Sequence, residues 1–210
     1  LSSGTTRSLV APVLSGLLLI YLLICVVVGW YWSREPDLQP ITSTRDSQTV
    51  PVSGELTAVT VAHLMSTLLN KPGGFITNDV APPGLWLDNM PHWEFGVLVQ
   101  VRDMTRAMRR DMARSQSQSA EDLDLAKAEP LFHFDNDSWA FPATESEYQS
   151  GLNAMEKYTR RLQAGDADFY ARADNLASWV GDVNTRLGSL SQRLSASVDQ
   201  GAITDGSRPR

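Results

Sequence analysis

The sequence predicts an all-α protein: an N-terminal transmembrane helix, then an elongated helical bundle with a long, heptad-patterned C-terminal helix. Residues 9–32 carry no charged side chain, as expected of a segment that crosses a bilayer. Apolar residues recur at helical spacing through most of the remaining chain. An unbroken heptad pattern, typical of a helix that packs along its whole length, then runs from Phe169 to Leu194.

The uncharged segment reads LVAPVLSGLLLIYLLICVVVGWYW. As a helix it would be roughly 36 Å long, enough to cross a hydrocarbon core of ~30 Å. It closes with Trp30, Tyr31 and Trp32, as an interfacial aromatic belt would. A core helix would normally carry a polar stripe, and a signal peptide would have a shorter apolar region with a small-residue cleavage site. We therefore expect residues 9–32 to be a retained single-pass anchor in the lipid bilayer.

The anchor divides the chain into five parts. We expect an N-terminal flank at 1–8, the transmembrane helix at 9–32, a flexible linker at 33–52, a helical extramembrane domain at 53–200 and a disordered tail at 201–210. The linker assignment rests on its prolines and small polar residues, which leave little apolar surface to bury.

The charge and cysteine content exclude some classes of function. The net charge is −6, and only Arg7 precedes the anchor, so the extramembrane part is acidic and we expect no nucleic-acid partner. The one cysteine, Cys25, lies in the anchor, which leaves no disulfide within the chain and no thiol metal site or nucleophile. Arg7 on one side against Arg34 and Arg45 on the other gives no clear orientation. The lysine-free segment up to Lys71 favours a cytoplasmic N-terminus and a periplasmic domain.

Two helices are predicted in the first half of the domain. The first spans 54–70 and ends at Lys71-Pro72-Gly73-Gly74. The second starts near Pro91, with Asp88 or Asn89 as its cap. Its expected buried residues are spaced three or four apart: Phe95, Leu98, Val101, Thr105, Met108 and Met112.

Two more helices follow a Ser/Gln-rich break at 115–119. Ser119 and Asp122 predict a capping box for a short helix that ends at Glu129-Pro130. Thr144 and Glu147 predict another capping box, for a helix that stops at Gly165. The buried face of this second helix is expected to hold Tyr148, Leu152, Met155, Tyr158 and Leu162.

The last predicted helix has the most regular pattern in the extramembrane part. Its seam steps alternately by four and three residues through Phe169, Ala173, Leu176, Val180, Val183, Leu187, Leu190 and Leu194. The flanking positions, such as Arg186 and Asn184, do not form the complementary acid–base pairs of a self-pairing parallel dimer. We expect the seam to pack against the chain's own helices as the spine of the bundle. A homo-oligomeric coil is the alternative.

An arginine stripe on the second helix is the best candidate binding site. It could bind lipid phosphate groups or an acidic partner, or it could form ion pairs with carboxylates of the same chain. The stripe consists of Arg102, Arg106, Arg109, Arg110 and Arg114.

Other site chemistry is weak in this sequence. His63, His92 and His133 do not share metal-ligand spacing, and we expect no metal and no cofactor. The segment 135–138 resembles the start of a calcium loop, but Trp139 occupies a position that needs an oxygen ligand. The glutamates that lie near apolar residues leave open a glycan-cleaving carboxylate pair: Glu94, Glu121 and Glu129.

Four stretches together resemble one family of bacterial proteins of unknown function, mostly proteobacterial. They are LDNMPHWEFGVLVQVRDM at 87–104, RSQSQSAEDLDLAKAEP at 114–130, FYARADNL at 169–176 and RLGSLSQRLSASV at 186–198. The resemblance implies a single-pass inner-membrane protein with a helical extramembrane region, and it brings no activity or catalytic residue. Members of the family continue into another apolar helical region where this chain has a polar tail, so we expect a short or truncated form.

The function predicted from these observations is not enzymatic. We expect a membrane-anchored scaffold or interaction subunit of a bacterial envelope complex, with protein partners. The alternatives are an envelope enzyme that acts on cell-wall glycan through a carboxylate pair and a periplasmic sensor domain.

Overall fold

The computed structural model describes residues 4–36, 52–114 and 120–206, and every regular element in these ranges is helical. The predicted all-α fold is therefore confirmed. Most of the linker predicted at 33–52 lies outside the described residues. The elements are α1 (Gly4–Trp32), α2 (Glu55–Asn70), the 3₁₀ turn η1 (Gly84–Trp86), α3 (Asn89–Ala107), the π-helical turn η2 (Met108–Met112), α4 (Leu123–Phe132), α5 (Thr144–Ala164) and α6 (Ala173–Gly206).

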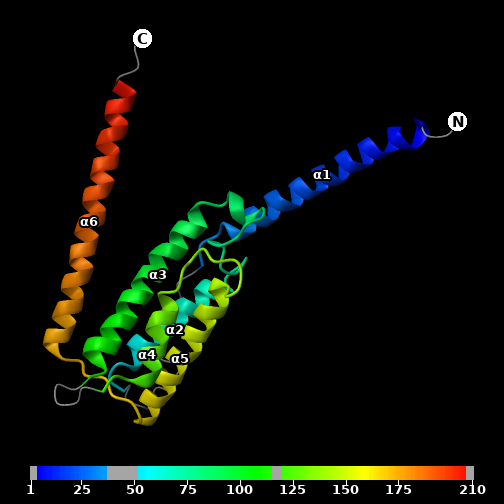
Figure 1. Cartoon of the computed structure of the whole chain (residues 1–210). Coiled ribbons are helices and arrows are strands. Elements are labelled where there is room, and N and C mark those ends of the chain that lie inside the picture. The colour runs from blue at the N-terminus through cyan, green and yellow to red at the C-terminus, as the bar shows by residue number, and fades with distance from the viewer. Residues whose placement is uncertain (1–3, 37–51, 115–119, 207–210) are drawn as a thin grey trace.

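Helices α2 to α5 form the bundle, and α1 and α6 extend outside it (Figure 1). Helix α5 packs closely on both α2 and α4, and α3 packs on the same two helices. The core is made of large side chains with almost no exposed surface, including Met65, Leu68, Leu98, Met108, Met112, Leu125, Phe132, Tyr148, Met155 and Tyr158. Burial of these side chains supplies the main favourable free energy of folding.

Local sequence explains the ends of the bundle helices. The side chain of Asp122 caps α4 by accepting hydrogen bonds from Asp124 N at 3.0 Å and Leu125 N at 3.2 Å. Gly165 ends α5 with φ of 82°, a left-handed conformation that glycine adopts at low cost. The capping role of Asp122 differs from the predicted box, whose Ser119 lies outside the described residues.

Three other sequence expectations are wrong. Pro130 does not end α4, which continues to Phe132 because the Phe132 side chain is buried against Gly151 of α5. Thr144 is not a cap; its hydroxyl donates to Asp135 O at 2.8 Å and Ser138 O at 3.0 Å. Phe95 is exposed, although the other five residues predicted for its face are buried.

Helix α1 has the length and composition of a membrane span over Ala11–Trp32, with a mean hydropathy of 2.7. Only 6% of this apolar window is buried, unlike the core helix of a soluble protein. A membrane anchor and a signal sequence both meet these criteria. The end of α1 contacts the domain, where Asn89 Nδ2 donates to Ser33 O at 3.0 Å and Ser33 Oγ at 2.9 Å.

Helix α6 is not the spine of the bundle, contrary to expectation. It begins at Ala173, which leaves Phe169 before the helix, and it continues to Gly206, past the predicted start of the tail. It stands beside α3 and runs away from the bundle (Figure 1). Phe169 packs on the core and Val183 is half-buried, but most of the seam does not pack on the chain's own helices. Its other large residues are exposed: Leu176, Val180, Leu187, Leu190 and Leu194.

Candidate functional site

The first arginine of the predicted stripe, Arg102, has a structural role within the bundle. Arg102 donates from Nε to Phe132 O at 2.6 Å and from Nη2 to Phe134 O at 2.8 Å and Tyr148 Oη at 3.0 Å. Burial raises the pKa of Tyr148 to about 12, although the Arg102 charge acts in the opposite direction. The hydroxyl therefore stays protonated and donates to Phe134 O at 3.2 Å. Arg102 thus closes the end of α4 rather than facing a partner.

Three further arginines pair with two carboxylates at the start and end of the α4 region. Arg109 Nη2 lies 2.7 Å from Glu121 Oε2, and Arg109 Nη1 also pairs with Glu129. Arg106 Nε lies 3.2 Å from Glu129 Oε1, and Arg114 Nη1 lies 3.7 Å from Glu121 Oε1. The hydrogen bonds that Arg109 donates to Glu121 and Glu129 raise the pKa of its guanidinium. These ion pairs neutralise much of the positive charge of Arg106, Arg109 and Arg114.

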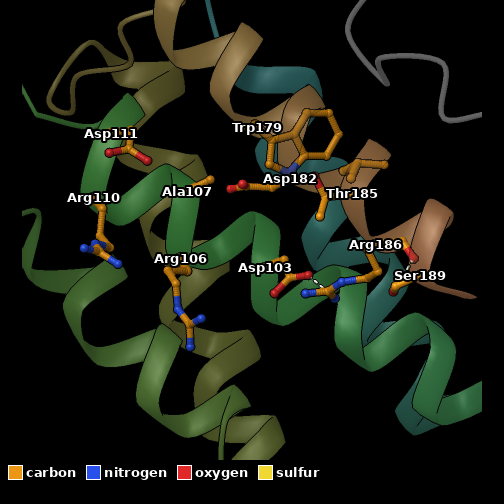
Figure 2. Close-up of a pocket in the computed structure, with 11 residues that line it drawn as sticks. Asp103, Arg106, Ala107, Arg110, Asp111, Trp179, Asp182, Thr185, Arg186 and Ser189 are labelled. Atoms are coloured by element: carbon orange, nitrogen blue, oxygen red, sulfur yellow. Dashed lines mark hydrogen bonds and ion pairs between the residues drawn. The ribbon is translucent and has the colours of Figure 1, made fainter.

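Arg110 differs from the other four because no ion pair or hydrogen bond joins its side chain to the described part of the chain. It lines a polar groove of about 390 Å³ between α3 and α6, together with Arg106 (Figure 2). Across the groove, Arg186 of α6 pairs with Asp103 of α3 (Figure 2). Asp182 also lines the groove. Because the groove is lined by both acidic and basic side chains, its electrostatic potential is not uniformly positive and does not favour an anion.

The π-helical turn η2 attaches α6 to the end of α3. Ala113 N donates to Met108 O at 2.8 Å, the five-residue spacing of a π turn. Met112 O accepts from Tyr170 N at 2.6 Å, and Asp111 O accepts from the Asn175 side chain at 2.6 Å. The start of α6 is therefore held by carbonyl groups at the end of α3.

An apolar groove of about 550 Å³ opens between α2, α3 and the start of α6. Its walls include Leu64 of α2, Met104 of α3 and the α6 residues Leu176 and Trp179. Leu176 is also a seam residue, so the groove and the exposed seam meet at this position. A Cβ added at Gly181 or Gly188, on another face of α6, would meet no atom within 4 Å. Much of the helix surface is thus uncovered.

The three glutamates considered for catalysis are engaged in ion pairs. Glu94 has no exposed side-chain surface and pairs with Lys71 at 2.5 Å. Burial acts to raise the pKa of Glu129, but hydrogen bonds from Arg106 and Arg109 outweigh it and leave the pKa lowered. A general acid of a glycosidase needs a raised pKa. Glu129 is therefore poorly suited to that role.

The histidines are not brought together. Within residues 4–36, 52–114 and 120–206, no group of three His, Cys, Asp or Glu side chains converges as metal ligands would. His133 instead accepts from Arg106 Nη2 at Nε2, 2.7 Å away, because a guanidinium can only donate. Its Nδ1 then donates to Glu129 O at 2.9 Å.

The apolar groove was not found by sequence reasoning. Its residues come from three separated helices, and helical periodicity predicted only some of them, such as Val101, Met112 and Leu176, and those as ordinary core positions. The groove is revealed by the exposed Leu176 beside the half-buried Trp179. The exposure of these two side chains depends on the position of α6 in the fold, which a sequence pattern does not determine.

Comparison with known proteins identifies a family and nothing more specific. A family model described as an uncharacterized protein conserved in bacteria, DUF2333, matches residues 5–208. No curated protein matches the chain. No solved structure matches it either.

Proposed function

The chain belongs to the DUF2333 family of bacterial proteins, and we propose that it is a membrane-anchored interaction subunit whose α6 binds an amphipathic helix of a partner protein. Helix α1 is the anchor in this proposal, at the bacterial inner membrane, and the bundle lies on the periplasmic side. The protein acts as a scaffold and performs no catalysis itself.

One observation carries this proposal: the heptad seam of α6 is exposed and begins at the apolar groove. Leu187 is 60% exposed and Leu194 is 68% exposed, although leucines at seam positions normally bury against a facing helix. An exposed apolar stripe of this length is typical of a protein-binding site. A helix laid along α6 would cover the seam and place its own end in the groove at Leu176.

The residues beside the seam favour a partner other than a second copy. Arg172 and Arg186 on one flank already pair with Asp174 and Asp103. The other flank carries neutral side chains such as Asn184, so two copies of α6 would meet without complementary charges. A partner helix with an apolar stripe and an acidic flank near Arg193 suits this surface better.

Site-specific photo-crosslinking in native bacterial membranes tests the proposal. A photoreactive residue would replace Leu187 or Leu190 in the full chain, with Gln192, an exposed polar residue on another face of α6, as the matched control position. We expect one discrete adduct from both seam positions and none from 192. Mass spectrometry of the adduct then identifies the partner.

Two results would contradict the proposal. Equal or absent crosslinking at all three positions would mean that the seam binds no protein. An adduct with twice the mass of the chain would show that the seam binds a second copy of the chain instead of a different protein.

A further inference from the structure

Two loops at one end of the bundle expose large apolar side chains. The loop before α3 presents Val80, Leu85 and Trp86, which is 55% exposed. The loop before α5 presents Trp139 and Phe141, which are 66% and 104% exposed. Such a concentration of apolar and aromatic groups on loops is unusual for a surface that faces only water.

The two loops are joined to each other. Asn78 Nδ2 donates to Ser138 O at 3.0 Å and to Glu145 Oε2 at 3.0 Å. Asn78 lies in the first loop, and Ser138 lies in the second. The exposed side chains therefore share one end of the bundle.

The same end holds the last turn of α1. Asn89, which follows the first loop, donates to Ser33 as described above. Trp32 lies against Gly73, where an added Cβ would be 2.7 Å from Trp32 Cδ2. An added Cβ on Gly29 would be 3.4 Å from Pro83 Cβ. Figure 1 shows α1 leaving the molecule from this end of the bundle.

The base of the first loop is fixed by a buried carboxylate. Glu94 accepts from Ile76 N and Thr77 N, each at 2.9 Å, and from the Thr77 hydroxyl at 2.5 Å. The loop is thus positioned by the bundle, and its apolar side chains are presented in a defined direction.

We propose that these two loops form a second membrane contact, in which Leu85, Trp86, Trp139 and Phe141 enter the interfacial layer of the bilayer. This inference rests on the proposed function, because it takes α1 as the membrane anchor. Pro83 lies beside Gly29 of α1, so the first loop is at the level where α1 leaves the hydrocarbon. Tryptophan side chains favour this layer, since the ring is apolar and the N–H is polar.

Apolar insertion rather than charge drives the contact. Asp135 and Asp137 lie in the second loop and would be repelled by anionic headgroups. The contact should therefore form on zwitterionic phosphatidylcholine, which has no net charge, and persist at high salt. It would hold the bundle against the bilayer instead of leaving it suspended from α1 alone.

Fluorescence quenching of the full chain in phosphatidylcholine vesicles tests this contact. Single-cysteine variants in a Cys25→Ser background would carry a polarity-sensitive fluorophore at Leu85→Cys or Phe141→Cys. Leu123→Cys is the matched control, since Leu123 is 84% exposed and lies at the other end of α4 from the second loop. Leu19→Cys reports on the anchor. Nitroxide lipids labelled near the headgroup or deep in the acyl chain are the quenchers.

We expect shallow nitroxides to quench positions 85 and 141 several-fold more than position 123, and deep nitroxides to quench position 19. Phe141→Glu should reduce quenching at position 85 and leave position 19 unchanged, whereas Leu123→Glu should change neither. Quenching at 19 with equal values at 85, 141 and 123 would overturn the loop contact and leave the anchor intact. Absence of quenching at 19 would overturn the anchor and the loop contact together.

Discussion

Lys71 Nζ and Glu94 Oε1 lie 2.5 Å apart, and their side chains are 1% and 0% exposed. Lys71 also donates to Gly74 O. This buried ion pair joins the end of α2 to α3 and fixes the loop between them. A buried pair is costly to desolvate, and removal of one partner leaves the other charge uncompensated.

Loss of either charge should strongly destabilise the bundle. We expect Glu94→Gln to lower the free energy of unfolding by about 3–5 kcal/mol, because Lys71 would stay buried without a counter-charge. Chemical unfolding of the full chain in detergent, followed by circular dichroism, measures this change. The double variant Lys71→Met/Glu94→Gln should recover part of the loss, and fully additive losses would contradict the coupling between the two residues.

The arginines of the stripe should contribute unequally to stability. Arg102→Met removes three hydrogen bonds from a charged donor, and we expect a loss of about 2–3 kcal/mol. Arg110→Ala, on the exposed side, should change stability by less than ~0.5 kcal/mol. The same unfolding measurement compares them, and equal effects would argue against the structural role of Arg102.

Acid should weaken the contact between α4 and α5. Burial acts to raise the pKa of Asp124, but Lys157 and Arg161 outweigh it and lower the pKa in the folded protein. The stabilisation is therefore present above the unfolded pKa of 3.8 and is lost as pH falls through the lower folded value. Asp124→Asn should flatten this acid limb of stability against pH. The exposed Glu156→Gln is the control, and an unchanged limb in Asp124→Asn would contradict the assignment.

Asp79 should show the opposite pH dependence. Burial, together with the charges of Glu145 and Glu94, raises its pKa in the folded protein above 3.8. The folded state then binds the proton more tightly, so stability decreases as pH rises from 3.8 through the folded pKa. Asp79→Asn should raise the unfolding midpoint at pH 7 and have little effect at pH ~3. A lower midpoint at pH 7 would show that the charged carboxylate is stabilising.

The seam of α6 should be dispensable for folding. Leu187→Ala should cost less than ~0.5 kcal/mol because the side chain is already exposed. Leu152→Ala, in the core, should cost about 2–5 kcal/mol. Thermal unfolding of the two variants compares these sites. A large loss in Leu187→Ala would mean that the seam packs on the bundle after all.

Periodicity predicted most helices well because burial repeats within each helix. The face of α5 from Tyr148 to Leu162 is buried as predicted, and Gly165 ends that helix. The heptad pattern of α6 also identified an apolar stripe correctly. The pattern could not show whether the stripe packs within the chain or on another protein, because a heptad pattern is the same for an intramolecular and an intermolecular partner.

The pairing of the arginine stripe could not be predicted from its spacing. The partners of Arg109 are Glu121 and Glu129, which belong to the α4 region and reach Arg109 only through the packing of α4 beside the end of α3. Arg102 finds its acceptors at Phe132 and Phe134 for the same reason. The π turn η2 also leaves no clear sequence signature, because its residues are ordinary helix formers.

Helix α6 is fixed to α3 over its first part only: Asp111 O and Met112 O hold its start, and Arg186 pairs with Asp103. From Arg186 the helix continues to Gly206, a projection of about 30 Å. A bend of about 10° at Arg186 would move the far end by roughly 5 Å. The Arg186–Asp103 ion pair therefore divides α6 into a held first part and a projecting second part that carries Leu190 and Leu194.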